Sequence, residues 1–484
     1  MSKVRKSIFL SFGQNYISFI IQFLVSLIIA RLLTPAEIGI FSVAMVMIGF
    51  AHTLRDFGVS SYIIQEKELT PEKIRAAFAL TLITAWVMAA AIGLGSGYAA
   101  EFYREPGIKS VMLVLSLNFI LIPFGSVPMA YMHREMDFKH ISLIKIYSNI
   151  IGSATTVGLA YAGYSYHSMA WGSVAGIVCT ILLVQVWRPK NLPLLPGFRE
   201  IRKVFSFGML SNSMMILNDI CQGGPDLIIG RLSGMAMVGF FGRSWGLISI
   251  FETLVMKPLW NVALPHFAQE SRTENGVKDG FLRSMTYVSA LAWPFYINLG
   301  LLAHPIIAVL YGKQWEPSVP LLQLLSISTL LTTPFLLLSS IMTAIGQMKQ
   351  NVYFLAMYAP ILVILMALAA PYGLVAIGSI FIGAKLIAGA IYMLQCRIVL
   401  EVSPMEMARA LRESAMVALA SAFIPVVILL LDGVLPESLW LKLILGLSGS
   451  LLGWIAGIFL FRHPLRIEIG NSFIAFKQFA ILSK

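Results

Sequence analysis

Long apolar runs follow one another through almost the whole sequence, and they constrain the fold more than any other feature. A run of about 20 apolar residues is long enough to cross a bilayer as a helix, and about fourteen such runs occur. They lie near residues 7–30, 38–54, 76–98, 109–130, 141–163, 166–187, 203–231, 236–256, 284–305, 318–343, 350–370, 373–396, 408–431 and 439–461. Since 58% of the residues are hydrophobic and only 12% are charged, we predict an all-α polytopic membrane protein with about 14 transmembrane helices.

The apolar runs exclude several other classes of protein. Membrane β-barrels show short alternating strands instead of continuous apolar runs. The first run is expected to remain as an anchor, because it is too long for a cleavable signal and no small-residue cleavage site follows it. The three cysteines, Cys179, Cys221 and Cys396, fall inside apolar runs, so neither a disulfide framework nor a zinc site is predicted.

Positive charge marks one side of the membrane. Most of the 35 Lys and Arg residues lie in alternate loops, beginning with Lys3, Arg5 and Lys6 before the first run. Basic loops stay in the cytoplasm, so both termini are predicted to be cytoplasmic. Topology then explains the net charge of +12, and we expect no nucleic-acid partner.

One segment of the sequence occurs twice in the same direction. IIARLLTPAEIGIFS at 28–42 corresponds to IIGRLSGMAMVGFFG at 228–242, at a constant offset of 200. The identical residues are Ile28, Ile29, Arg31, Leu32, Ala36, Gly39 and Phe41, which recur as Ile228, Ile229, Arg231, Leu232, Ala236, Gly239 and Phe241. Parallel repeats of six helices predict two pseudo-symmetric lobes around a central cavity. We therefore expect an N-terminal lobe at 1–198, a C-terminal lobe at 199–400, and two further helices with a basic cytoplasmic tail at 401–484.

The second copy of the repeat is longer than the first. Ser11-Phe12-Gly13 recurs as Ser206-Phe207-Gly208, at an offset of 195 instead of 200. About five additional residues must therefore precede Ile228, in a stretch that contains Gln222-Gly223-Gly224-Pro225. Proline removes a helical hydrogen bond, so the seventh run is predicted to be kinked or bulged there.

Polar residues form a stripe on two of the apolar runs. In the first run they are Ser11, Asn15, Ser18, Gln22 and Ser26, and in the seventh they are Ser211, Asn218, Gln222 and Asp226. These spacings place each set on one face of a helix. A polar face is costly against lipid and is tolerated against water. The amides Asn15, Gln22, Asn218 and Gln222 are therefore predicted to bind substrate, with interhelical hydrogen bonding as the alternative.

Ionisable residues inside the runs are the other candidates for function. Arg243 and Lys385 are predicted to bind an anionic group, unless each belongs to a structural ion pair. Asp219, Asp226 and Glu252 are predicted to couple transport to Na⁺ or H⁺. Pairing, for example of Asp226 with Arg243, is the alternative.

A further cluster lies at the cytoplasmic end of the second run. His52, Arg55 and Asp56 are interpreted as a cytoplasmic gate or a headgroup contact, although an ordinary interfacial cluster would have the same pattern. No catalytic constellation, metal motif or phosphate-binding loop is found. We therefore expect no enzymatic activity, no metal and no cofactor beyond a coupling cation.

Several segments resemble one family of membrane proteins. They are DLIIGRLSGMAMVGFFGRS from Asp226, HREMDFKHISLIKI from His133, FSFGMLSN from Phe205, and the prolines Pro258 and Pro265. The chain resembles bacterial polysaccharide repeat-unit flippases, the Wzx-like polysaccharide-transport branch of the multidrug/oligosaccharidyl-lipid/polysaccharide exporter superfamily. The resemblance covers about residues 1–400 and does not specify a sugar.

The resemblance implies a function and a place in the cell. Such proteins move an oligosaccharide linked to undecaprenyl diphosphate from the inner to the outer leaflet of the bacterial inner membrane, by alternating access. Lys385 and Arg243 would then meet the diphosphate or acidic sugars. A polysaccharide polymerase and a chain-length regulator would be partners beside the lipid bilayer. Relatives often carry several cavity arginines and this sequence has few charged candidates, so a more neutral glycan fits. A multidrug exporter of the same superfamily, or a membrane glycan polymerase, is the alternative.

Overall fold

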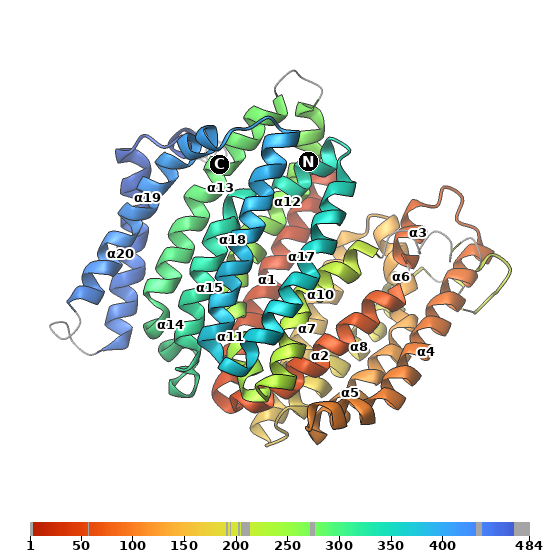
Figure 1. Cartoon of the computed structure of the whole chain (residues 1–484). Coiled ribbons are helices and arrows are strands. Elements are labelled where there is room, and N and C mark those ends of the chain that lie inside the picture. The colour runs from red at the N-terminus through yellow and green to blue at the C-terminus, as the bar shows by residue number, and fades with distance from the viewer. Residues whose placement is uncertain are drawn as a thin grey trace, which may run out of the picture. The chain divides into compact units, whose positions relative to one another are not determined.

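The computed structural model describes residues 3–56, 58–189, 192–193, 195–201, 204, 213–271, 276–431 and 438–468, with the backbone alone at 3–12, 56 and 213–216. In this part of the chain the regular structure is helical, without strands. The helices form two compact units, residues 1–242 and 243–484, and Figure 1 labels them in chain order. The three-part division predicted from the sequence, with boundaries at 198 and 400, stays a prediction.

The helices of the first unit are α1 (Lys3–Leu32), α2 (Pro35–Asp56), α3 (Val59–Gln65), α4 (Pro71–Tyr103), α5 (Pro106–Leu121), α6 (Pro123–Arg134), α7 (Phe138–Tyr161), α8 (His167–Trp187) and α10 (Ser213–Leu232). α11 (Met235–Phe251) crosses into the second unit. That unit continues with η1 (Glu252–Met256), α12 (Lys257–Glu270), α13 (Gly276–Leu301), α14 (Ala303–Leu310), η2 (Lys313–Trp315), α15 (Ser318–Thr332), η3 (Thr333–Phe335), α16 (Leu338–Ala344), α17 (Met348–Ala369), η4 (Ala370–Tyr372), α18 (Leu374–Val399), α19 (Pro404–Leu430) and α20 (Leu439–Leu460).

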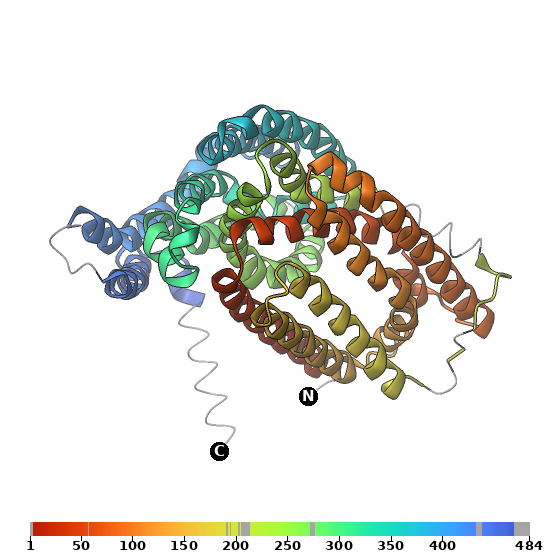
Figure 2. The same ribbon diagram turned by 90° about the horizontal axis from the view of Figure 1, so that it is seen from below.

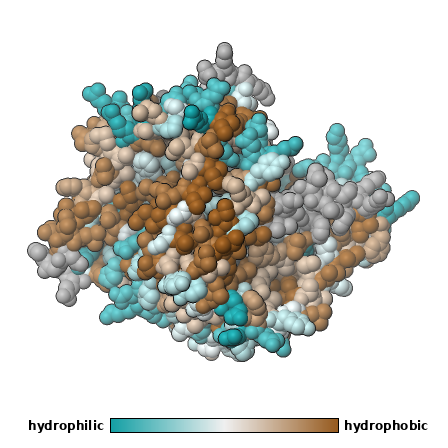
Figure 3. Space-filling view, viewed as in Figure 1, coloured by the Kyte–Doolittle hydropathy of each residue, from teal (hydrophilic) through white to brown (hydrophobic). Residues whose placement is uncertain are grey.

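The predicted fold class is confirmed, whereas the count of fourteen spans is not. Within the described residues, ten helical segments are long and apolar enough to cross a membrane, or twelve if two bent pairs each count as one span. The bent pairs are α5 with α6, at 51°, and α13 with α14, at 74°. α7 occupies a predicted span but falls outside this set, because its polar and charged residues lower its hydropathy. α10 also occupies a predicted span, and its side chains are described only from residue 217 onward. Over α17 and α18, hydrophobic residues cover the middle of the helices and hydrophilic ones gather toward the ends (Figure 3).

In the first unit, α7 packs along α8 and α1, and α10 packs against α2 (Figure 2). Glycine makes the closest of these approaches possible. A Cβ added at Gly152 of α7 would lie 2.9 Å from the carbonyl oxygen of Gly172 on α8 and 3.4 Å from the Cα of Gly176. Small residues let helix backbones approach closely in a membrane, where packing and not the hydrophobic effect drives association.

In the second unit, α13 lies between α15 and α19, and α19 pairs with α20 (Figure 1). Gly449, Gly453 and Gly457 form a stripe at four-residue spacing on α20, and an added Cβ at each would meet a residue of α19. The indole nitrogen of Trp454 on α20 donates to the carbonyl of Ala290 on α13 at 2.9 Å. The last two helices are therefore fixed to the second unit by close packing and a hydrogen bond.

The duplicated segment forms a reciprocal contact. A Cβ added at Gly39 on α2 would collide with the carbonyl of Met235, and one added at Gly239 on α11 would collide with the carbonyl of Pro35. These two contacts are equivalent, because residues 35 and 39 correspond to 235 and 239 in the repeat. The two copies therefore cross at matching points, related by a local two-fold symmetry.

The kink or bulge predicted at Pro225 does not take the form of a π-helical bulge, and a kink there stays a prediction. α10 runs as one α-helix through Pro225, although the additional residues inferred for this copy fall partly outside the described residues. A helix in a membrane can retain a proline when neighbouring groups satisfy the freed carbonyl. The departure from α-helical geometry lies further along, in the π-helical segment η1 that directly follows α11.

Candidate functional site

α10 presents two carboxylates to α2 in the first unit. Asp219 contacts the hydroxyl of Thr53 through a short hydrogen bond. A Cβ added at Gly223 would lie 2.6 Å from Val46 Cγ1, so this face of α10 packs closely on α2. Asp226 is seven residues from Asp219, which places it on the same face of the helix. Two of the residues predicted to couple a cation thus lie along one helix interface.

The two carboxylates differ in their hydrogen bonds. Asp219 is bonded to Thr53, whereas Asp226 Oδ1 is buried and has no hydrogen-bond partner in the described part of the chain. A buried acceptor that lacks a donor is costly, and a proton or a cation would satisfy it. Among the described residues, no group of three or more His, Cys, Asp or Glu side chains is placed to hold a metal ion.

The amides of the predicted polar stripes lie at the surfaces of their helices. Asn15, Asn218 and Gln222 are exposed, as is Gln22, whose amide donates to Asn149 Oδ1 on α7 at 3.3 Å. The stripe on α1 is not uniform, because Ser18 is buried. Ser11 and Ser211 have no described side chains. The sequence did not reveal the contact with Asn149, since the two partners are 127 residues apart.

The cluster interpreted as a cytoplasmic gate lies against α4 and α5. The ring of His52 stacks on that of Phe119 with centroids 4.4 Å apart. The backbone carbonyl of Arg55 accepts a hydrogen bond from Thr84 Oγ1 at 3.4 Å. The side chain of Asp56 lies outside the described residues. His52 is therefore packed within the first unit, and its role as a gate stays a prediction.

Arg243 is enclosed by aromatic rings in the second unit. Its guanidinium carbon lies 5.3 Å from the ring centroid of Tyr311 and 5.2 Å from that of Trp315. Both rings are almost completely buried, with exposures of 3% and 0%. Cation–π contacts of this kind hold an arginine in place and are strengthened by burial. The sequence could not indicate them, because the rings lie about 70 residues away.

Glu252 and Lys385 form a second charged group in this unit. Glu252 is the first residue of η1, and Lys385 lies in the middle of α18. Lys385 and Lys257 both act electrostatically on the Glu252 carboxylate, which in turn acts on the phenol of Tyr296. Tyr296 was not among the predicted residues, since a tyrosine in an apolar run gives no signal of its own.

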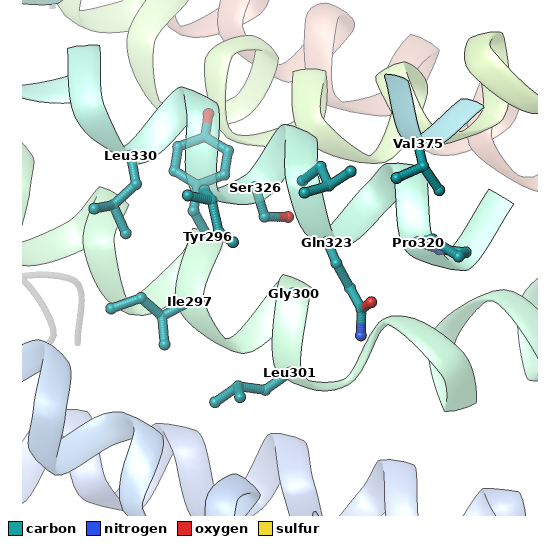
Figure 4. A pocket seen from close by; sticks show the side chains of 11 residues that line it. Tyr296, Ile297, Gly300, Leu301, Pro320, Gln323, Ser326, Leu330 and Val375 are labelled. Atoms are coloured by element: carbon teal, nitrogen blue, oxygen red, sulfur yellow. The ribbon is translucent and has the colours of Figure 1, made fainter. Parts of the chain in front are cut away.

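Tyr296 also lines a groove in the second unit. The groove has a volume of about 520 Å³ and lies between α13 and α15, with Val375 of α18 at its edge. The Tyr296 hydroxyl donates to the carbonyl of Ile248 at 3.4 Å. Figure 4 shows the hydroxyl of Tyr296 and the amide of Gln323 pointing in opposite directions, with Ser326 between them. The walls are otherwise mainly aliphatic.

Apolar helices that carry isolated carboxylates, amides and a lysine define a helical membrane protein of the transporter class. The fold is similar to that of the lipid II flippase MurJ in its inward closed conformation, with a TM-score of 0.74 and 12% identity over 94% of this chain and 99% of that one. The chain belongs to the polysaccharide biosynthesis protein family, which matches residues 28–320. The resemblance stated from the sequence is thereby confirmed.

Two relatives of known name are similar over most of their length. The lipopolysaccharide biosynthesis protein WzxC of Escherichia coli (strain K12) is 24% identical over 348 residues, which cover 70% of each chain. The succinoglycan biosynthesis transport protein ExoT of Rhizobium meliloti (strain 1021) is 25% identical over 337 residues, covering 68% of this chain and 67% of the relative.

Proposed function

We propose that the protein flips an oligosaccharide repeat unit, linked to undecaprenyl diphosphate, from the cytoplasmic to the periplasmic leaflet of the bacterial inner membrane. Membership of the polysaccharide biosynthesis family across residues 28–320 carries the proposal. The name of ExoT, a biosynthesis transport protein, and a fold similar to that of a lipid II flippase support it. Both termini are proposed to be cytoplasmic, and a polymerase and a chain-length regulator are proposed partners on the periplasmic side.

The proposed reaction is a translocation by alternating access and needs no covalent chemistry. Moving one elementary charge across 100 mV is worth about 2.3 kcal/mol. A diphosphate with about two negative charges would therefore gain roughly 4–5 kcal/mol on leaving a negative interior. The membrane potential therefore favours outward movement of the headgroup, and a coupled cation would add to it.

Individual residues take distinct roles in this proposal. Lys385 attracts the diphosphate, because its positive charge lies partly buried within a membrane span, where an anionic group is attracted strongly. The exposed amides, Asn15, Gln22, Asn218 and Gln222, donate to and accept from sugar hydroxyls. Arg243 is occupied by two aromatic rings, so Lys385 makes the main headgroup contact.

Asp226 is proposed as the main coupling residue. Its buried and unbonded carboxylate oxygen is the acceptor that a proton or Na⁺ would fill. Asp219 is bonded to Thr53 and supports this site. If the rate of flipping by the purified protein responds to neither a proton gradient nor a sodium gradient, coupling at Asp226 is wrong and the membrane potential is the driving force.

The proposal is tested by reconstitution. The full chain is placed in proteoliposomes with an undecaprenyl diphosphate-linked oligosaccharide, and the access of an external lectin to the sugar is followed. We expect lectin access to increase faster than in empty liposomes, and Lys385→Met to slow it at least tenfold. Arg397→Gln, an exposed position on the same helix, is the matched control and should leave the rate unchanged.

The same preparation separates flipping from other activities. Liposomes loaded with a cationic dye would report multidrug export, and the release of free lipid diphosphate would report polymerisation. Transport of the dye without movement of the lipid-linked sugar would overturn the proposed function.

A further inference from the structure

The second unit holds one acidic and one basic residue on neighbouring membrane helices. Glu252 follows the last residue of α11, and Lys385 lies within α18. Both side chains are partly buried. A charged group inside a membrane protein is normally paired or faces a water-filled space. The groups that surround these two residues therefore show whether the charges pair with each other.

Helical spacing places Glu252 and Lys385 on the faces of α11 and α18 that contact each other. The rings of Trp245 on α11 and Phe381 on α18 meet with centroids 5.6 Å apart. Glu252 comes seven residues after Trp245, and Lys385 comes four residues after Phe381. Residues four or seven apart share a helix face. Each charged residue thus lies on the face of its helix that meets the other, in agreement with the electrostatic effect of Lys385 on the Glu252 carboxylate.

Two other polar groups on neighbouring elements interact with Glu252. Lys257, at the start of α12, attracts the Glu252 carboxylate and is exposed. The phenol of Tyr296 on α13 is only 3% exposed and is bonded to the carbonyl of Ile248. Lys385 is therefore the partly buried basic group beside Glu252, while Lys257 lies at the surface.

The backbone at Glu252 has an unusual geometry. The π-helical segment Glu252–Met256 begins at this residue. Such segments shift the side chains that follow them and are found often at functional sites. The carboxylate thus lies at the last position that follows the regular phase of α11, directly before the π-helical turn shifts the residues that come after it.

We propose that Glu252 is the resident counter-ion of Lys385, and that the anionic phosphate headgroup of the transported lipid binds by taking its place. This inference rests on the proposed function and assigns a positioning residue to it. The carboxylate keeps Lys385 paired when no substrate is bound, so the lysine is never an isolated charge in an apolar environment. To bind Lys385, the headgroup must first displace Glu252. Its binding free energy is therefore the difference between the attraction of Lys385 for the headgroup and that for Glu252, and this weaker binding allows the headgroup to be released.

The pairing itself is tested without substrate, through the stability of the purified full-length protein. Removing one partner of a buried pair leaves an uncompensated charge, whereas removing both is often neutral. We expect Glu252→Gln and Lys385→Met each to lower the melting temperature, and the double variant to recover at least half of the combined loss. Arg397→Gln, on the exposed surface of α18, should change nothing. Additive losses in the double variant would overturn the pairing.

The exchange is tested by binding of farnesyl diphosphate, with farnesol as the uncharged control. We expect Glu252→Gln to bind the diphosphate roughly tenfold more tightly, because a competing negative charge is removed. Lys385→Met should bind it roughly tenfold more weakly, and neither variant should alter farnesol binding. Glu252→Asp, which keeps the charge, should bind like the wild type and provides a second variant if the glutamine variant fails to fold.

The outcomes distinguish the inference from the function on which it rests. Unchanged or weaker diphosphate binding by folded Glu252→Gln overturns the exchange, whether or not the protein flips lipid-linked sugar. Active flipping with no coupling between the two residues overturns the pair and leaves the flippase function in place. If the wild type binds farnesyl diphosphate no better than farnesol, the exchange is overturned, and so is the proposed contact between Lys385 and the headgroup.

Discussion

The two copies of the duplicated segment cross at equivalent glycines but begin their helices differently. In the first copy, Thr34 N donates to Glu37 at 2.7 Å, and Glu37 N donates to the Thr34 hydroxyl at 3.3 Å, which is a capping box. In the second copy the corresponding residues are Gly234, with φ of 90°, and Met237. The crossing depends on the absence of a Cβ in both copies, whereas helix initiation was free to diverge.

The copies also differ in charge. Extending the offset of 200 back along the helix from Ile228 pairs Gln22 with Gln222 and Ser26 with Asp226. Both glutamines are exposed, so the amide is kept in each copy. At the second of these positions the carboxylate is found in the second copy alone. The proposed cation coupling at Asp226 therefore has no counterpart at residue 26 of the first copy.

The crossing glycines should give the largest loss of stability. Gly39→Ala would drive its methyl group into the carbonyl of Met235, and Gly239→Ala would do the same at Pro35. Each is expected to destabilise the protein by about 1–3 kcal/mol, measured by thermal unfolding in detergent, and to slow flipping. Gly49→Ala on α2 is the matched control, because no atom lies within 4 Å of its added Cβ. A clear difference between the two crossing variants would contradict the local symmetry.

The charge difference predicts opposite effects on transport and on stability. Asp226→Asn should abolish the response of flipping to an ion gradient, because the amide can neither take up a proton nor balance a cation. Stability should be retained or slightly raised, since a buried charge is replaced by a neutral group of the same size. Ser26→Ala, at the corresponding position of the first copy, is the control. Gradient-dependent flipping by the asparagine variant would remove the distinction between the copies.

The cap in the first copy should contribute a smaller amount. Glu37→Ala removes the hydrogen bond to Thr34 N and the short contact with Ser165. The loss is expected to be about 1–2 kcal/mol. Met237→Ala, the same substitution in the second copy, removes no cap and should cost less. Thermal unfolding of the two variants side by side measures the difference, and equal losses would mean that the cap contributes nothing.

The sequence was sufficient for the class and the repeat. Apolar runs of membrane-spanning length predict helices directly, because a backbone in lipid must satisfy its own hydrogen bonds. α7 shows the limit of that reasoning, since its polar residues lower its hydropathy although it occupies a predicted span. Pro225 was predicted to kink or bulge its helix, whereas α10 continues through it as an α-helix and the π-helical segment lies at Glu252–Met256. The local sequence shows only that proline tends to disturb a helix. Whether the helix is disturbed depends on its tertiary contacts.

The side-chain partners were harder to predict than the spans. Thr53 and Asp219 are 166 residues apart, and no local pattern links them. Asp226 was identified as a candidate because a carboxylate in an apolar run is unusual, but its unbonded oxygen could be recognised only in three dimensions. Gly39 and Gly239 were recognised in the sequence as identical residues of the repeat. That they make a reciprocal contact could be seen only in the structure, where the two copies cross.

The smallest expected effect concerns an arginine that the two copies share. Arg231 lies over the ring of Phe102 on α4, with its guanidinium carbon 5.0 Å from the centroid. Since Phe102 is 55% exposed, the contact is worth about 0.5–1 kcal/mol. Arg231→Gln should lower the free energy of unfolding by this amount, and so should Phe102→Leu, because each removes the same contact. The double variant should therefore lose no more than either single variant. Independent losses would mean that Arg231 acts through another group and that the ring contributes only its packing.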